Sequence, residues 1–226
     1  MSQLYYGVPI ELDEEKNKFV NVPKFIHPFT CLIAGPTSSG KSTFVKNLIE
    51  AREEDIFPQP NRIFWFYSQW QPLYEHVHGV NFQQGIPESV GSFDPEDKTL
   101  IIIDDLMSQV NSEVVELFTK GSHHRNISVV YIVQNLFHSG KEHRTISLNS
   151  HYMVLFKNPR DSSQISHLAR QIFPDKPNFL QKVYHEATSE PYGYLFIDLK
   201  QDTPESMRLR SHLFDPVTYI YVMSTY

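Results

Sequence analysis

The chain alternates short apolar runs with stretches in which apolar residues recur at helical spacing. The runs are rich in β-branched and aromatic residues and end at turn residues, which is typical of strands. They lie at residues 30–35, 62–68, 99–105, 128–134, 152–157 and 193–199. Four of the first five are almost continuously apolar. This pattern indicates strands that are covered on both faces of a parallel sheet.

Helical patterns fall between several of these runs. One extends from Lys41 to about Ile56 and another from Val110 to Phe118, each with a single apolar stripe. A third follows Asp161, which we expect to cap the helix, with Gln164 three residues on. Alternating strands and helices predict an α/β fold with a mainly parallel central sheet flanked by helices.

The ends and one internal stretch depart from this alternation. Residues 1–24 show no clear period and are predicted to form an N-terminal arm, with room for one strand near 18–22. Residues 69–98 are rich in Pro and Gly, and we expect an irregular excursion there. Residues 25–226 are then predicted to be a single domain, in which 158–226 holds helices and a further strand.

Composition narrows the class of protein. With 226 residues, 40% of them hydrophobic, the chain is long enough for one substantial core. No apolar run reaches the length of a membrane span, and the N-terminus lacks a signal-like pattern, so we expect neither secretion nor a membrane location. The single cysteine, Cys31, lies in an apolar run and is interpreted as a buried thiol in a reducing compartment.

Net charge is −6, from 20 basic and 26 acidic residues. Proteins that coat DNA without sequence preference are usually basic, so this balance argues against that class. It does not argue against a ring that presents a few basic groups to a central channel.

A phosphate-binding loop follows the first of the apolar runs. Residues 35–43, GPTSSGKST, satisfy the pattern G-x-x-x-x-G-K-[ST] between a predicted strand and a predicted helix. In such a loop, backbone N–H groups and the helix N-terminus bind phosphate, Lys41 reaches the β- and γ-phosphates, and Ser42 gives a hydroxyl to Mg²⁺. The predicted nucleotide-binding residues are Gly35, Pro36, Thr37, Ser38, Ser39, Gly40, Lys41, Ser42 and Thr43. The predicted cofactors are ATP and Mg²⁺.

Two carboxylates end the apolar run LIIIDDL at residues 100–106. Open α/β sheets bind ligands at the carboxyl ends of their strands, where Asp104 would complete the Mg²⁺ shell with Ser42. Asp105 is the candidate for activating or orienting water. The next run ends in Gln134, whose amide could donate to the γ-phosphate or orient water. A strand predicted at 62–68, between the helix after the phosphate loop and the acidic strand, favours the additional-strand division of P-loop ATPases. The N-K-x-D motif of GTPases is absent from the sequence.

Together these segments carry a resemblance. GPTSSGKST, LIIIDDL, LFTKGSHHRNISVVYIVQNLF and YMVLFKNPRD are similar to the viral genome-packaging ATPases of the FtsK–HerA superfamily, over roughly residues 25–175. The likeness is closest to the enzymes of Polinton/Maverick elements, adintoviruses and virophages, and more distant to poxvirus-type packaging ATPases.

The resemblance implies a RecA-like ATPase core in a homo-oligomeric ring, a hexamer or pentamer, that pumps double-stranded DNA into a viral capsid or its portal vertex. It implies a location in the host cytoplasm or nucleus. Lys41 and Ser42 become phosphate and Mg²⁺ residues, Asp104 the Mg²⁺-side acid and Gln134 the sensor. The superfamily often has Glu at the position where this chain has Asp105. The chain therefore departs from the superfamily pattern at its candidate catalytic base.

A ring ATPase also needs an arginine from the neighbouring subunit to stabilise charge in the transition state. The resemblance implies Arg125 as the preferred candidate, because it lies just before the Gln134 strand, where the arginine fingers of this superfamily tend to lie. Arg144 and Arg160 compete with it.

Three other patterns in the sequence are explained by structural or surface roles and do not require a binding site. The histidines, among them His123–His124, lack the spacing of a zinc site. The aromatic run IFWFYSQW at 63–70 is expected to pack in core and edge positions rather than to stack on bases. Lys141, His143 and Arg144 form the most basic local patch for DNA, and a solvated loop explains that patch equally well.

Three functions follow from the sequence. The first is an ATP-hydrolysing, DNA-translocating motor, favoured by the series of motifs. The second is a small-molecule or nucleotide kinase, since GPTSSGKST also fits kinase loops, although no arginine-rich lid follows residue 135. The third is a non-hydrolysing, nucleotide-gated capsid assembly factor, against which the intact Lys41, Ser42 and Asp104 argue.

Overall fold

The computed structural model of the chain describes residues 25–87, 89–106, 109–121, 125–137 and 140–223. These residues divide into two units, a larger one that ends at Met153 and a smaller one that begins at Val154. The predicted N-terminal arm, with its strand near 18–22, lies outside the described residues. A single domain over 25–226 stays a prediction.

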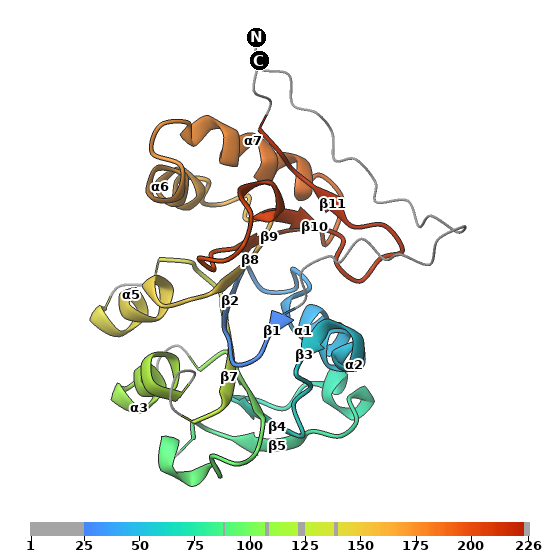
Figure 1. Cartoon of the computed structure of the whole chain (residues 1–226), viewed down its shortest axis with the longest axis vertical. Coiled ribbons are helices and arrows are strands. Elements are labelled where there is room, and N and C mark those ends of the chain that lie inside the picture. The colour runs from blue at the N-terminus through green and yellow to red at the C-terminus, as the bar shows by residue number, and fades with distance from the viewer. Residues whose placement is uncertain (1–24, 88, 107–108, 122–124, 138–139, 224–226) are drawn as a thin grey trace. The chain divides into compact units, whose positions relative to one another are not determined.

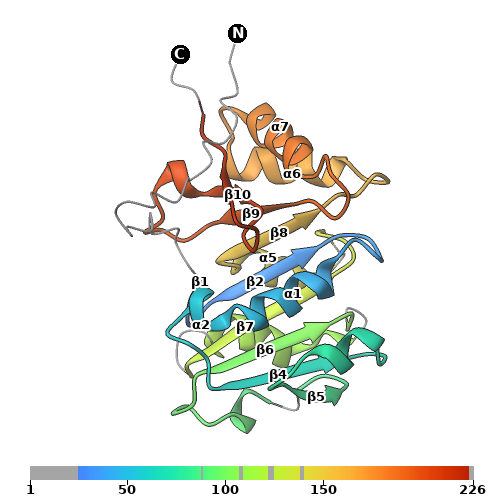
Figure 2. The same ribbon diagram turned by 90° about the vertical axis from the view of Figure 1, so that its right-hand side faces the viewer.

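A parallel sheet forms the centre of the larger unit. Its strands stand in the order β2-β7-β6-β4-β5, and every neighbouring pair is parallel. They are β2 (Thr30–Ala34), β4 (Arg62–Tyr67), β5 (Asn81–Gln84), β6 (Thr99–Asp104) and β7 (Ile127–Val133). Figure 2 shows these strands across the face of the sheet. All residues of β2, β6 and β7 are buried, as the continuous apolar runs predicted.

Helices cover both faces of this sheet. One face carries α1 (Lys41–Glu50) and α2 (Arg52–Asp55), and the opposite face carries α3 (Ser112–Glu116) and α5 (Lys141–Leu148) (Figure 1). The buried residues of α1 are Phe44, Val45, Leu48 and Ile49, the stripe expected from the sequence. The predicted α/β class with a mainly parallel sheet is therefore confirmed.

The helix predicted from Lys41 to Ile56 is wrong at its end. The structure ends α1 at Glu50, continues with the short α2, and enters strand β3 (Ile56–Phe57), which pairs with β1 (Phe25–Ile26). Pro58 follows directly, and the residue before a proline is disfavoured in helical conformation. Extended backbone at Phe57 is the physical result.

The predicted helix over 110–118 also differs from the structure. It begins later, because Asn111 caps it by accepting hydrogen bonds at Oδ1 from Glu113 N (3.1 Å) and Val114 N (3.3 Å). It then continues from α3 into a π-helical segment, η4 (Leu117–Gly121). An asparagine cap of this kind satisfies backbone donors that would otherwise be orphaned.

Residues 69–98 hold more structure than the sequence predicted. They contain the 3₁₀ helices η1 (Pro72–His76) and η2 (Val90–Ser92) and the edge strand β5, so the expectation of an irregular excursion is wrong for β5. The sequence of β5 is NFQQ, with one apolar residue, and three of its four positions are exposed. An edge strand with so little burial leaves no alternating pattern in the sequence.

The smaller unit combines two helices with antiparallel strands. Strand β8 (Tyr152–Phe156) spans the boundary between the units. Helices α6 (Ser163–Ile172) and α7 (Pro177–Ala187) follow, and then β9 (Tyr194–Asp198), η5 (Glu205–Met207), β10 (Leu209–Ser211) and β11 (Tyr219–Ile220). Strand β10 pairs antiparallel with both β9 and β11. The strands predicted at 152–157 and 193–199 are confirmed.

The cap of α6 is displaced by one residue from the prediction. Ser162, not Asp161, is the N-cap residue. Asp161 still binds the first turn, since Oδ1 accepts from Ser163 N at 3.1 Å and Oδ2 accepts from Gln164 Nε2 at 2.7 Å. The pKa of Asp161 is lowered, most by a hydrogen bond from the Ser163 hydroxyl to Oδ1 and next by the bond from Gln164 Nε2.

Cys31 is fully buried, as the sequence predicted, and burial raises the pKa of its thiol. Within the described part of the chain, no helix is both long and apolar enough to cross a bilayer.

Candidate active site

The loop that follows β2 has the backbone of a phosphate cradle. Gly40 stands immediately before α1 with φ +104°, a conformation that suits glycine because it has no Cβ. Ser38 also has a positive φ, +63°. The first turn of α1 contains no acidic residue, and the positive end of its dipole faces the loop. Such an arrangement binds anions without needing a side chain.

Lys41 folds over this loop. Its Nζ donates to the backbone oxygens of Gly35 (2.7 Å) and Pro36 (2.8 Å). Burial lowers the pKa of the ammonium group, and the charges of Asp104 and Asp105 oppose that shift. The cation therefore lies inside the loop, within the field of the two carboxylates predicted to share the site.

Asp104 ends β6 and is 3% exposed. Its Oδ2 accepts hydrogen bonds from Ser42 Oγ at 3.2 Å and from the Tyr74 hydroxyl at 2.9 Å. Burial raises the pKa of Asp104, while the hydrogen bonds from Tyr74 and Ser42 lower it. The structure thus joins Ser42 and Asp104, the predicted Mg²⁺ residues, although they are 62 positions apart. Hydroxyl and carboxylate oxygens are ligands that Mg²⁺ accepts beside phosphate and water, so the donors fit this ion.

Asp105 and Gln134 also meet. Gln134 Nε2 donates to Asp105 Oδ1 at 3.0 Å, and both side chains are exposed. The contact follows from the topology, because β6 and β7 are parallel neighbours with Asp104 opposite Ile132. Asp105 has φ +54°, a left-handed conformation that costs a non-glycine residue about 1–2 kcal/mol. Backbone strain of this kind gathers at functional sites.

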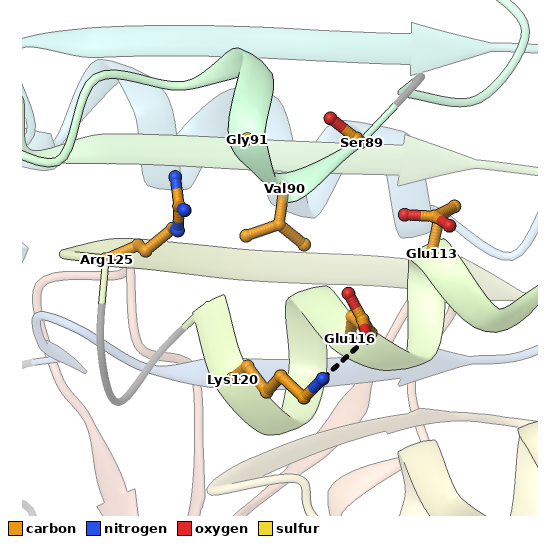
Figure 3. Close-up of a pocket in the computed structure, with 7 residues that line it drawn as sticks. All are labelled: Ser89, Val90, Gly91, Glu113, Glu116, Lys120 and Arg125. Carbon is orange, nitrogen blue, oxygen red and sulfur yellow. Dashed lines mark hydrogen bonds and ion pairs between the residues drawn. The ribbon is translucent and has the colours of Figure 1, made fainter.

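Arg125 lies at the other end of β7. The strand has seven residues, which span ~20 Å at about 3.3 Å per residue, so Arg125 and Gln134 occupy opposite edges of the sheet. Arg125 is half-buried in a pocket, with its side chain directed toward η2 (Figure 3). The pocket is lined by Ser89, Val90, Gly91, Glu113, Glu116, Lys120 and Arg125.

Arg125 is therefore not part of the site of its own chain. The two competing arginines are exposed, Arg144 on α5 and Arg160 after β8 in the smaller unit. The assignment of the trans-acting arginine stays a prediction.

The aromatic run behaves mainly as core, as expected. Trp65 and Phe66 are buried, whereas Trp70 is 51% exposed. Tyr74 was not singled out in the sequence, since it lies in the stretch that lacks a period. Its aromatic neighbours in the sequence give no signal of a contact with Asp104, because that contact depends on where η1 packs.

The basic and histidine-rich stretches are only partly described. Lys141 and Arg144 are exposed on the first turn of α5, and His143 is half-buried against Tyr131, with ring centroids 6.2 Å apart. His123 and His124 lie outside the described residues. No group of three or more His, Cys, Asp or Glu side chains in the described part of the chain is placed to hold a metal ion.

Comparison with solved structures identifies the fold. The genome-packaging NTPase B204 of Sulfolobus turreted icosahedral virus 2, solved with ATP-γ-S, superposes with a TM-score of 0.51 at 12% identity, over 85% of this chain and 98% of that one. The cytoplasmic domain of the Thermomonospora curvata type VII secretion ATPase EccC gives a TM-score of 0.50 at 12% identity, over 86% of this chain and 25% of that one. No protein-family model and no curated protein matches the sequence.

The chain has the fold of the RecA-like P-loop NTPases. Strand β7 stands between the loop-bearing β2 and the acidic β6, the arrangement expected for the additional-strand division. At this level of identity the likeness concerns the fold, and the chemistry has to be argued from the residues of this chain.

Proposed function

We propose that this protein is an ATP-hydrolysing motor that translocates double-stranded DNA into a viral capsid. The observation that carries the proposal is the meeting of two pairs at one sheet edge, Ser42 with Asp104 and Asp105 with Gln134, beside Lys41. A loop alone binds phosphate. The second pair adds what hydrolysis needs, an acid held beside the position of an attacking water.

Each residue has a distinct task in this proposal. The backbone N–H groups of residues 35–43 and the end of α1 hold the phosphates, and Lys41 leaves its loop carbonyls to neutralise the β- and γ-phosphates. Ser42 and Asp104 would hold Mg²⁺, which would supply positive charge against the phosphates. Asp105, fixed by the Gln134 amide, accepts the proton of the attacking water or orients it.

The Asp105–Gln134 pair favours hydrolysis over the kinase alternative. A kinase must exclude water and admit an acceptor hydroxyl, whereas both of these side chains are exposed at the site. The same pair argues against a non-hydrolysing assembly factor, because that function needs only nucleotide binding.

Catalysis is completed by a neighbouring subunit in this proposal. Arg125 lies about 20 Å from the Gln134 end of β7, so it can reach a γ-phosphate only across a subunit boundary. This requires a homo-oligomeric ring, a hexamer or pentamer. Lys141 and Arg144 offer exposed positive charge for DNA in a chain of net charge −6.

The viral setting of the proposal rests on likeness. Resemblance to packaging ATPases of Polinton/Maverick, adintovirus and virophage type suggests a capsid or portal vertex as partner and the host cytoplasm or nucleus as location. The genome-packaging NTPase B204 supports a packaging role by its fold.

The test is ATP hydrolysis with and without double-stranded DNA, on the wild type and on Lys41→Ala, with Lys46→Ala as matched control. Lys46 lies on the same helix and pairs with the exposed Glu50. We expect DNA to stimulate turnover, Lys41→Ala to abolish it and Lys46→Ala to leave it unchanged. Turnover that ignores DNA in a chain that stays monomeric with nucleotide would contradict the proposal.

A further inference from the structure

A tyrosine outside the nucleotide motifs contacts the metal-side acid. Tyr74 lies in η1 and is 2% exposed. Its hydroxyl donates to Asp104 Oδ2 at 2.9 Å, a shorter distance than the 3.2 Å from Ser42 Oγ to the same oxygen. A hydrogen bond to a charged carboxylate is stronger than a bond between neutral groups.

Aromatic packing fixes the position of the Tyr74 ring. It stacks on Phe82 with ring centroids 5.1 Å apart, and contacts Trp65 at 5.1 Å, Trp70 at 5.4 Å and Tyr67 at 5.6 Å. These rings come from β4, β5 and the segment between them. A ring held on several sides has little rotational freedom, so its hydroxyl is presented to Asp104 at a fixed place.

The geometry of the carboxylate has a consequence for metal binding. The hydrogen bonds given to the Asp104 side chain by described residues both fall on Oδ2. They hold the carboxylate through Oδ2, so Oδ1 would be the oxygen that binds a cation. Partners that orient a ligating carboxylate in this way typically contribute 10–100-fold to metal affinity or activity.

We propose that Tyr74 is a positioning residue for the Mg²⁺ of this site, acting through Asp104. The inference rests on the proposed nucleotide site, since it assumes that Asp104 ligates the metal. It assigns a functional role to η1 and the aromatic cluster, which lie outside the phosphate loop.

The experiment compares Tyr74→Phe with Tyr67→Phe in the full-length chain. Each change removes one hydroxyl from the same aromatic cluster and keeps the ring, and among described residues the hydroxyls bonded to Asp104 are those of Ser42 and Tyr74. Binding of ATP-γ-S is measured against Mg²⁺ concentration and again in excess EDTA. ATP turnover against Mg²⁺ is measured in parallel.

We expect Tyr74→Phe to raise the Mg²⁺ concentration for half-maximal binding and turnover about tenfold, with metal-free nucleotide affinity within about twofold of wild type. Tyr67→Phe should follow the wild-type Mg²⁺ curve. A structural defect alone would lower the amount of folded protein without moving the Mg²⁺ midpoint.

Two results would overturn the inference, and they differ from each other. If Tyr74→Phe and Tyr67→Phe share the wild-type midpoint, Tyr74 does not position the metal acid, while the proposed ATPase stands. If wild-type binding and turnover do not depend on Mg²⁺, then Asp104 is not a metal ligand, and the proposed function falls with the inference.

Discussion

Gln134 and Asp105 join the ends of two neighbouring strands, with 3.0 Å between Nε2 and Oδ1. The bond orients a strained aspartate, at φ +54°, beside the loop that would carry the γ-phosphate. This pair distinguishes the site from a simple phosphate-binding loop.

The pair should act as one catalytic unit. We expect Asp105→Asn to lower kcat about 100-fold and Gln134→Ala to lower it less, with nucleotide affinity nearly unchanged. The double variant should lose no more than Asp105→Asn alone, because Gln134 acts through Asp105. A double-mutant cycle of kcat checks this, and losses that simply multiply would show that the two residues act independently.

The trans-acting arginine can be tested by mixing inactive variants. Lys41→Ala has a dead site and an intact Arg125, whereas Arg125→Ala has an intact site without that arginine. If Arg125 acts across the boundary, each variant alone is inactive and the mixture recovers part of the wild-type turnover, since some interfaces combine both intact parts. The pair Lys41→Ala with Arg144→Ala is the matched comparison. If Arg144→Ala alone is inactive and its mixture with Lys41→Ala recovers turnover, the trans-acting arginine is Arg144.

Gly40 should be intolerant of a side chain for reasons of backbone alone. Alanine at φ +104° is strained by about 1–3 kcal/mol. We expect Gly40→Ala to distort the loop and weaken ATP-γ-S binding at least tenfold, with the rest of the fold retained. Isothermal titration and circular dichroism check the two parts. Wild-type affinity in Gly40→Ala would show that the loop does not need this conformation to bind phosphate.

Stability should fall in mild acid because of His27. The residue is 4% exposed, with Nδ1 2.6 Å from Ser128 Oγ and Nε2 3.0 Å from Asn126 Oδ1. Burial lowers its pKa below 6.5, against the opposing effect of Asn126. The unfolded chain then binds the proton more readily, so His27 stabilises the fold fully above pH 6.5 and less as pH falls toward its folded pKa.

The loss is at most about 1.4 kcal/mol per pH unit for one proton. Urea unfolding at pH 8.0 and pH 5.5 measures it, and His27→Gln should reduce the difference. An equal difference in wild type and His27→Gln would assign the acid sensitivity to other groups.

The smaller unit should depend on a buried ion pair. Arg210 and Asp198 are each 1% exposed with 3.0 Å between Nη2 and Oδ2, and the guanidinium lies 4.6 Å from the centroid of the Phe196 ring. Removing one partner leaves a buried charge, so Arg210→Met should cost about 3–5 kcal/mol. Glu50→Ala, which breaks the exposed pair with Lys46, should cost less than about 1 kcal/mol. Denaturant unfolding compares them, and equal costs would contradict the argument.

The sequence was most informative where burial is complete. The runs at β2, β6 and β7 are apolar because both faces of the sheet are covered, so the strands and the edge that carries Asp104 could be predicted. The strand order then brings Gln134 to Asp105, and the contact follows from the topology.

The sequence was least informative where packing between separate elements determines the structure. Strand β5 has a mostly exposed, polar sequence and exists by pairing with β4. Tyr74 lies in a stretch without periodicity, and its contact with Asp104 depends on aromatic rings from separate elements. Neither feature has a local signature that a single sequence could reveal.

Translocation itself is measured most directly by displacement of a third strand from a triplex at one end of a DNA duplex. With ATP and Mg²⁺, the wild type should release the third strand at a rate that depends on ATP, while Lys41→Ala and Asp105→Asn should release none. Steady DNA-stimulated hydrolysis by the wild type with no release of the strand would contradict the claim that this P-loop site drives movement along DNA.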